Sequence, residues 1–154
     1  MNSQSNNLRI QSILRIFSEG NHKKAYIELL GYVAEFPNDL MATYNLGVIS
    51  ERVNHINKAI ECYSLVIKKN KNHWQSKNNL YLIYFHEKKY QGALKLVNEV
   101  LIIKPKYQPA LRDKAHILFY LKKLDEALSN VVESLKIKKT DYIALNIMGM
   151  IYTA

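Results

Sequence analysis

Residues 56–70 read INKAIECYSLVIKKN, and the order of their side chains decides the fold of the chain. The apolar residues recur three and four positions apart, which is the spacing of one face of an α-helix. They are Ile56, Ala59, Ile60, Tyr63, Val66 and Ile67. Further along, the same order recurs as Tyr90, Ala93, Leu94, Val97, Val100 and Leu101. We therefore expect equivalent amphipathic helices in successive parts of the chain.

An alanine recurs at a fixed interval of 34 residues, at Ala25, Ala59, Ala93 and Ala127. A fixed period of this length is typical of an array of helix–turn–helix repeats. It predicts repeats at residues 6–39, 40–73, 74–107 and 108–141, with a partial repeat at residues 142–154. Pro37 and Pro105 should end second helices. We expect residues 1–5, which are mostly polar, to be a disordered N-terminal tail.

The repeats resemble those of the tetratricopeptide repeat (TPR) family. The resemblance is carried by the segments ATYNLGVI, NKAIECYSLVI, QGALKLVNEVLIIKPKY, LDEALSNVVESLKI and ALNIMGMIY. It implies an all-α fold, an α-solenoid of paired helices in a right-handed superhelix, with about nine helices. It also implies a protein-interaction scaffold, which binds a peptide or a partner helix in its concave groove. One repeat departs from the others, because Tyr81 occupies the slot that holds Gly47, Ala115 and Gly149. A ring there is expected to push the two helices of that repeat apart or to shift them locally.

Catalysis by this chain is not expected. The sequence has no glycine-rich phosphate loop, no HExxH motif, no GxSxG motif and no pair of cysteines. Cys62, the one cysteine, is interpreted as a small helix residue in a reducing compartment. We therefore expect no catalytic residue, no cofactor and no metal site. No signal peptide and no apolar run of roughly 20 residues is present, so we expect no transmembrane segment and a cytoplasmic location.

The resemblance also implies which side chains line the groove, since in the family the first helix of each repeat points into it. Mapped onto this sequence, they are Tyr44, Asn45, Arg52, Asn78, Asn79, Phe85, His86, Arg112, His116, Phe119 and Tyr120. Chaperone co-factor TPR domains clamp a C-terminal carboxylate with lysine, asparagine and arginine. The matching slots here include Ile10, Leu14 and Gln75, so that activity is not expected. Asn45 and Asn79 match in part the asparagine ladder of O-GlcNAc transferases.

The last predicted helix has no charged residue after Asp141, and apolar residues cover several of its faces. It therefore resembles an interior helix of an array, whereas terminal repeats normally have a polar outer face. One interpretation is that the chain is a fragment of a longer bacterial TPR protein. The other is a homodimer through the C-terminal helix, with self-association by Ile147, Met150 and Ile151.

Two further functions stay open. The chain could be the N-terminal arm of a larger glycosyltransferase or sulfotransferase whose catalytic domain lies beyond residue 154. It could also be a basic adaptor for nucleic acid or an anionic membrane surface, since its net charge is +9. Lysines gather after the predicted second helices, at Lys68, Lys69, Lys71, Lys104, Lys106, Lys136, Lys138 and Lys139. Only 4 of the 22 basic residues are arginines, which favour bidentate phosphate contacts, so nucleic acid is the less favoured partner.

Overall fold

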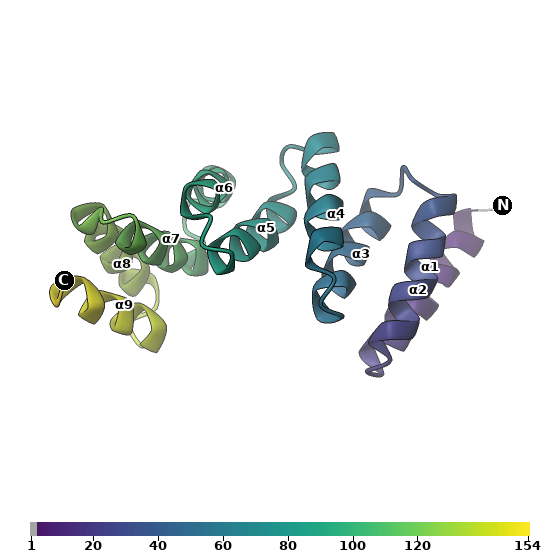
Figure 1. The fold of residues 1–154 in the computed structure, drawn as a ribbon, viewed down its shortest axis with the longest axis horizontal. Helices are drawn as coiled ribbons and strands as arrows, with labels where there is room; N and C mark the ends of the chain where they lie inside the picture. The colour runs from purple at the N-terminus through teal and green to yellow at the C-terminus, as the bar shows by residue number, and fades with distance from the viewer. Residues whose placement is uncertain (1–2) are drawn as a thin grey trace. The chain divides into compact units, whose positions relative to one another are not determined.

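The computed structural model describes residues 3–154, and these residues form nine α-helices and no strand (Figure 1). The helices are α1 (Ser3–Ser18), α2 (His22–Glu35), α3 (Leu40–Arg52), α4 (Ile56–Lys69), α5 (Trp74–His86), α6 (Tyr90–Ile103), α7 (Gln108–Tyr120), α8 (Leu124–Ile137) and α9 (Tyr142–Tyr152). The predicted all-α fold is therefore confirmed; each of the four complete repeats holds two helices, and the partial repeat holds α9 alone. Helix α1 begins inside the segment predicted to be a disordered tail, while residues 1–2 lie outside the described residues.

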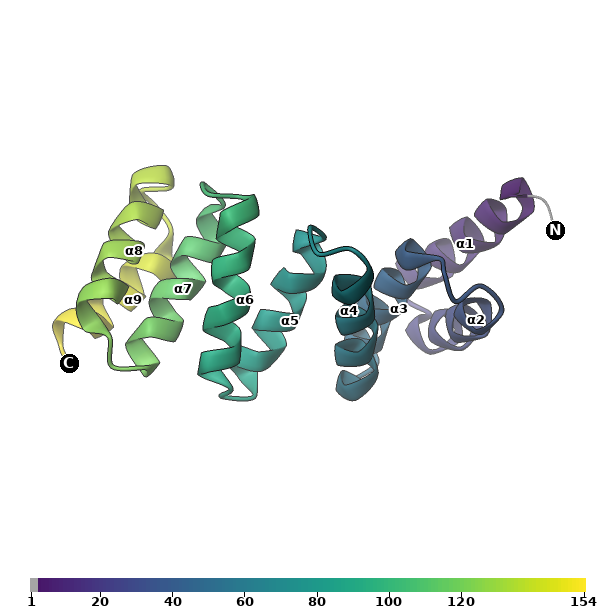
Figure 2. The ribbon, with the colours of Figure 1, turned by 90° about the horizontal axis from the view of Figure 1, so that it is seen from above.

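The helices form two compact units. The N-unit is Met1–Lys71 and contains α1 to α4, and the C-unit is Asn72–Ala154 and contains α5 to α9. Within each unit, every helix packs against the next one along the chain, and in the C-unit α7 also contacts α9. Figure 2 shows this succession of neighbouring helices within each unit from a second direction. Each unit is thus a stack of helical hairpins.

The recurring alanines lie on the buried faces of the second helices. Ala25, Ala59, Ala93 and Ala127 are all completely buried. A methyl group is the largest side chain that leaves two helix backbones in close contact, so the 34-residue interval reflects a packing requirement. Larger side chains fill the space around them, with Leu29, Tyr32 and Leu46 in the N-unit and Tyr81, Val97 and Ile117 in the C-unit.

The repeat of residues 74–107, in which Tyr81 replaces a small residue, packs by an exchange of side-chain sizes. In α3, a Cβ atom on Gly47 would lie 2.7 Å from Cε1 of Tyr63, so the glycine leaves room for the ring that α4 supplies. In the next repeat the sizes are exchanged, because Tyr81 lies on the first helix and Val97 takes the slot of Tyr63. Tyr81 and Val97 are both buried in one cluster. The ring is therefore matched by a smaller partner on the facing helix.

The turns inside the repeats share a left-handed backbone residue at the same 34-residue interval. Gly20 has φ 88°, Asn54 62°, Lys88 58° and Lys122 61°. Glycine and asparagine adopt this conformation readily, whereas a lysine is strained there because its Cβ crowds the backbone. The N-unit thus uses favourable residues at this position, and the C-unit uses two lysines.

Replacing Lys88 or Lys122 with glycine is expected to raise the free energy of unfolding of the C-unit by about 0.5–1 kcal/mol each, because it relieves this strain. Denaturant unfolding followed by the fluorescence of Trp74, the single tryptophan, would measure the change. Lys95→Gly is the control, since Lys95 is an exposed lysine inside α6. That glycine should destabilise the unit by about 1 kcal/mol. A loss of stability in all three variants would contradict the strain argument.

Candidate functional site

Six aromatic and imidazole rings meet at one end of the C-unit. They come from the last turn of α5, the first residue of α6 and the last turns of α7, and we call them the aromatic cluster: Phe85, His86, Tyr90, His116, Phe119 and Tyr120. Five of the six were predicted to line the groove. The structure brings these five together and adds Tyr90.

Phe85 lies at the centre of the aromatic cluster. Its ring centroid is 4.8 Å from that of His116 and 5.8 Å from those of Tyr90 and Tyr120. Tyr90 and Tyr120 stack in parallel, with centroids 4.9 Å apart and planes inclined by 2°. Rings in such mutual contact have little rotational freedom left, so the surface is ordered before any partner arrives.

The aromatic cluster is accessible. Tyr120 is 43% exposed, His86 is exposed, and the other four members are half-buried. Burial lowers the pKa of His116, and the charge of Arg112 acts in the same direction, while Asp113 opposes both. The imidazole is therefore largely neutral at pH 7. The cluster presents aromatic ring faces and two phenol groups, a combination that suits an amphipathic partner.

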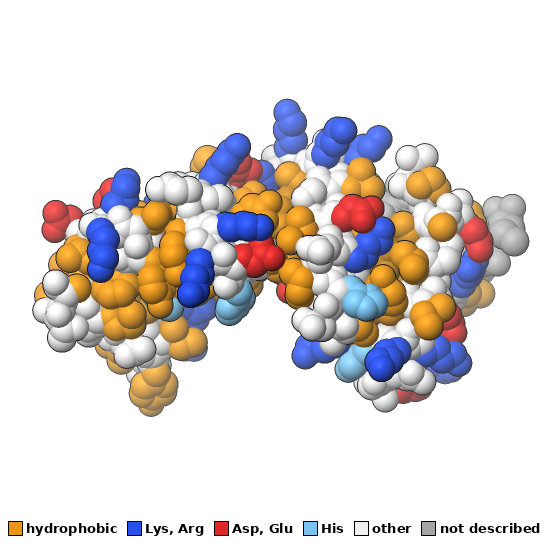
Figure 3. Space-filling model, viewed as in Figure 1, with side chains coloured by type: hydrophobic (Ala, Val, Ile, Leu, Met, Phe, Trp, Pro, Cys, Tyr) orange, Lys and Arg blue, Asp and Glu red, His pale blue; other side chains and the backbone are white. Residues whose placement is uncertain are grey.

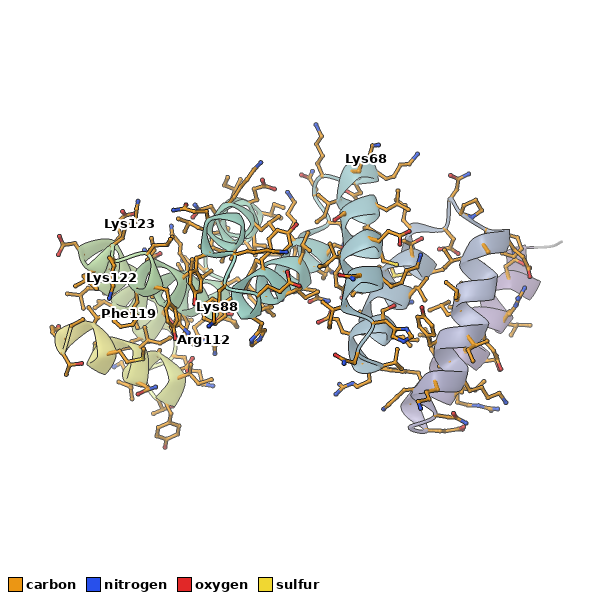
Figure 4. The ribbon with its side chains drawn as sticks, viewed as in Figure 1. Lys68, Lys88, Arg112, Phe119, Lys122 and Lys123 are labelled. Atoms are coloured by element: carbon orange, nitrogen blue, oxygen red, sulfur yellow. The ribbon has the colours of Figure 1, made fainter. Side chains whose placement is uncertain are left out.

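Lysines border the aromatic cluster at the two adjoining turns, and we call Lys88, Lys89, Lys122 and Lys123 the lysine edge. Figure 3 shows hydrophobic side chains next to Lys and Arg side chains on this part of the surface, and Figure 4 locates Lys88, Phe119, Lys122 and Lys123. Lys89 pairs with Glu87 at 2.7 Å and Lys123 with Glu126 at 2.9 Å. Nζ of Lys122 lies 5.9 Å from the ring centroid of Phe119. The site is thus aromatic at its centre and basic at its border.

Arg112, a predicted groove residue, is occupied by contacts inside the C-unit. Its guanidinium lies 2.9 Å from Oδ1 of Asp113 and 3.4 Å from Oδ2 of Asp141, and its side chain is only 20% exposed. Gln108 donates to Asp141 as well, at 2.6 Å. Because two carboxylates already neutralise Arg112, it fixes α7 against the start of α9 and is a poor anchor for a ligand.

The other predicted groove residues are not members of the aromatic cluster. Asn78 and Asn79 are half-buried on α5, and Nδ2 of Asn78 donates to Oδ1 of Asn79 at 3.4 Å. In the N-unit, Tyr44 and Asn45 are half-buried on α3. Arg52 is exposed and lines a hollow with Val48 and Glu51. These residues stay predictions as ligand contacts.

Two of the three residues predicted for self-association are buried, so they cannot form a contact surface. Ile147 is 1% exposed and Ile151 is 7% exposed, because this face of α9 packs against α7 and α8. Met150 is half-buried. The apolar side chains that α9 exposes are instead Tyr142, Ile143, Leu145 and Tyr152.

The rest of the described chain offers little reactive chemistry. Burial raises the pKa of the Cys62 thiol to about 11, so the side chain is a protonated core residue at neutral pH. Within residues 3–154, no group of three or more His, Cys, Asp or Glu side chains is arranged to hold a metal ion. No helix among the described residues is long and apolar enough to cross a membrane.

Sequence reasoning missed Tyr90 and the significance of Lys88 and Lys122. Tyr90 was assigned to the inner face of a second helix, although it is the first residue of α6 and reaches Tyr120. A signal was present for the lysines, since Gly20 and Asn54 occupy the same place in the 34-residue interval and both favour positive φ.

Comparison with known proteins supports the fold. Neither a protein-family model nor a curated protein matches the sequence. A tetratricopeptide repeat protein from Parabacteroides merdae has a TM-score of 0.88 and 19% identity over 97% of this chain, which spans 59% of that protein. A chain of MamA from Desulfovibrio magneticus RS-1 that runs from residue 41 to the end has a TM-score of 0.90 and 16% identity, over 96% of this chain and 84% of that chain.

A third solved structure contains a bound peptide. The first TPR of Spaghetti (RPAP3), bound to the HSP90 peptide SRMEEVD, has a TM-score of 0.70 and 21% identity. The match covers 74% of this chain and 90% of that domain's chain. Identities this low establish a shared fold. The predicted helix–turn–helix solenoid is therefore confirmed, while ligands and partners do not transfer with it.

Proposed function

Because the chain has the tetratricopeptide-repeat fold, we propose that it is a non-catalytic protein-interaction scaffold that binds a peptide or a partner helix. The observation that carries this proposal is the aromatic cluster. Partly exposed rings that are held in place by one another lose little entropy when a partner covers them. Tyrosine is also among the residues that contribute most to binding energy at protein interfaces.

The contacts to a partner should differ from those of a carboxylate clamp. The RPAP3 domain, which shares the fold, was solved with a peptide. In this chain, the clamp slots include Ile10, Leu14 and Gln75, and none of these side chains carries a positive charge. We infer that binding energy comes from rings at the end of α5 and α7, with the polypeptide terminus of the ligand playing a minor part.

Selection from a display library of random peptides tests the proposed function. The full chain is expected to enrich a family of related peptides, and the Phe85→Ala/Tyr120→Ala variant should lose most of them. Trp74 fluorescence confirms that the variant is folded. If the intact chain enriches no peptide family, or if the double variant enriches the same one, the proposal is wrong.

We also propose self-association through the exposed apolar face of α9 as a second candidate. Tyr142 is 81% exposed and Ile143 is 56% exposed, which is unusual for large apolar side chains so close together. Ile143→Glu should then shift a dimer to monomer in sedimentation experiments without unfolding the chain. Ile147→Glu is the contrast, since it buries a charge and should destabilise the C-unit. A wild-type chain that is monomeric at high micromolar concentration would exclude this candidate.

A further inference from the structure

The lysine edge contains two cations that the chain itself does not neutralise. Among the ion pairs of the described residues, Lys89 and Lys123 each have a carboxylate partner, whereas Lys88 and Lys122 have none. Both unpaired lysines are exposed. Lys88 lies two residues before Tyr90, and Lys122 lies two residues after Tyr120. Two lysines without a carboxylate partner therefore lie within two residues of the two stacked tyrosines in the sequence.

Stability does not explain why lysine occupies these positions. Lys88 and Lys122 have left-handed backbone conformations, and in the N-unit the same slots hold Gly20 and Asn54, which adopt them at lower cost. A residue held in a strained backbone conformation, where glycine or asparagine would be less strained, often serves a function. A positive charge at the border of an aromatic surface is such a function, because it selects the charge of whatever the rings contact.

We propose that the aromatic cluster and the lysine edge together bind an acidic peptide segment, with an aromatic or aliphatic side chain on the rings and carboxylates on Lys88 and Lys122. This inference rests on the proposed function and specifies the chemistry of its ligand. The end of α5 contacts the end of α7 through Phe85 and Tyr120, whose ring centroids are 5.8 Å apart. Packed helices lie about 8–10 Å apart, so the turns that follow α5 and α7 are on the order of 10 Å apart. In an extended peptide, carboxylates about three residues apart span the same distance.

The same charges fit a nucleic acid less well. A nucleic-acid strand carries one phosphate about every 3.4 Å, so tight binding requires a long track of unneutralised cations. The lysine edge offers two, and it contains no arginine. The neighbouring rings are closely packed against each other, and Tyr90 already stacks on Tyr120, so bases would have to compete for those faces.

Two peptide pools would test the proposal. The acidic pool is built from Asp, Glu, Phe, Tyr, Leu and Gly, and the amide pool is identical except that Asn and Gln replace Asp and Glu. The immobilised full chain should retain the acidic pool about tenfold better than the amide pool, and added salt should reduce the difference. A labelled thymidine oligonucleotide and vesicles of anionic lipid serve as the competing probes.

Matched variants then locate the charge effect. Lys88→Gln/Lys122→Gln should weaken retention of the acidic pool about tenfold and leave the amide pool unchanged, while Lys88→Arg/Lys122→Arg should retain binding. The control is Lys106→Gln/Lys138→Gln, which removes the same charge beyond the opposite ends of α6 and α8. Each of these helices has 14 residues and so extends about 20 Å. Trp74 fluorescence reports on folding in every variant.

The outcomes separate the inference from the proposed function. Equal retention of the two pools, or an equal loss in the control variant, would overturn the acidic-ligand inference and leave peptide binding intact. Retention of neither pool, while the random library still yields a peptide family, would overturn it in the same way. Stronger retention of the oligonucleotide or vesicles, dependent on Lys88 and Lys122, would replace the peptide with that partner. Failure of the pools and the random library together would remove both proposals.

Discussion

Replacing Tyr81 with alanine is expected to lower the free energy of unfolding of the C-unit by about 3–5 kcal/mol, the usual range when a large buried ring is removed. Tyr81 is 1% exposed and lies between α5, α6 and α7, where no small movement of a neighbour can fill the space it leaves. Urea unfolding followed by Trp74 fluorescence measures the loss. A change below about 1 kcal/mol would show that the ring does not support the core.

Two companion variants identify the cause of that loss. Tyr81→Phe keeps the ring and removes the hydroxyl that donates to Asp113 at 3.0 Å, so it should cost only about 1 kcal/mol. Tyr81→Gly/Val97→Tyr transfers the ring to α6 and so copies the Gly47–Tyr63 arrangement of the N-unit. It should recover part of the stability lost in Tyr81→Gly. Failure to recover any would mean that the two hairpins are not interchangeable in this way.

Replacing Asp141 with alanine is expected to destabilise the C-unit by about 2–3 kcal/mol, because one carboxylate serves several partners. It accepts from the backbone N–H groups of Ile143 and Ala144 at the start of α9, and also from Gln108 and Arg112. Gln108 and Arg112 would be left with fewer acceptors in a largely buried position. Chemical unfolding at pH 7 checks the value, and Asp125→Ala, at an exposed site on α8, is the control.

The same carboxylate should give the C-unit a defined pH dependence. Burial opposes ionisation of Asp141, but hydrogen bonds from Gln108, Ala144 and Ile143 and the charge of Arg112 outweigh it and lower its pKa. A lowered pKa in the folded state stabilises the fold fully above the unfolded value of about 4. That contribution is lost as the pH falls through the folded pKa. In Asp141→Ala, the free energy of unfolding of the C-unit should therefore fall less steeply as the pH is lowered below about 4. The same fall in the variant and in the wild-type chain would contradict this role.

The helices could be predicted from the sequence because the same small, buried residue is required at the same position of every repeat. Ala25, Ala59, Ala93 and Ala127 mark the same close contact in each repeat, and all four are buried as the period requires. The burial of Ile151 could also have been predicted, since it shares its place in the repeat with Ile49, Ile83 and Ile117, which are buried. Ile147 shares its place with Asn45, Asn79 and Asp113, so the period gave no such signal.

The candidate site was predicted in part, and the misses have physical reasons. Phe85, His116 and Tyr120 follow from the face of a first helix, whereas Tyr90 joins them from a second helix through a turn. The ion pair of Arg112 with Asp141 depends on how α7 packs against the start of α9, and residue spacing in the sequence does not give that packing. The effect of Tyr81 was judged from one slot, although its packing depends on Val97 across the hairpin. The contacts of Tyr90, Arg112 and Tyr81 lie between elements, and spacing along one helix does not supply them. The left-handed positions of Lys88 and Lys122 are local, and Gly20 and Asn54 at the same interval could have indicated them.

The affinity of Tyr120→Ala for a peptide selected by the intact chain tests the central claim most directly. Tyr120 is 43% exposed, so its removal should leave the fold intact while weakening binding about tenfold or more. Ile102→Ala is the matched control, because Ile102 is 79% exposed on α6 and lies outside the aromatic cluster. We predict that fluorescence anisotropy will show the loss for Tyr120→Ala and wild-type affinity for Ile102→Ala. Wild-type affinity in Tyr120→Ala would contradict a scaffold that binds its partner through these rings.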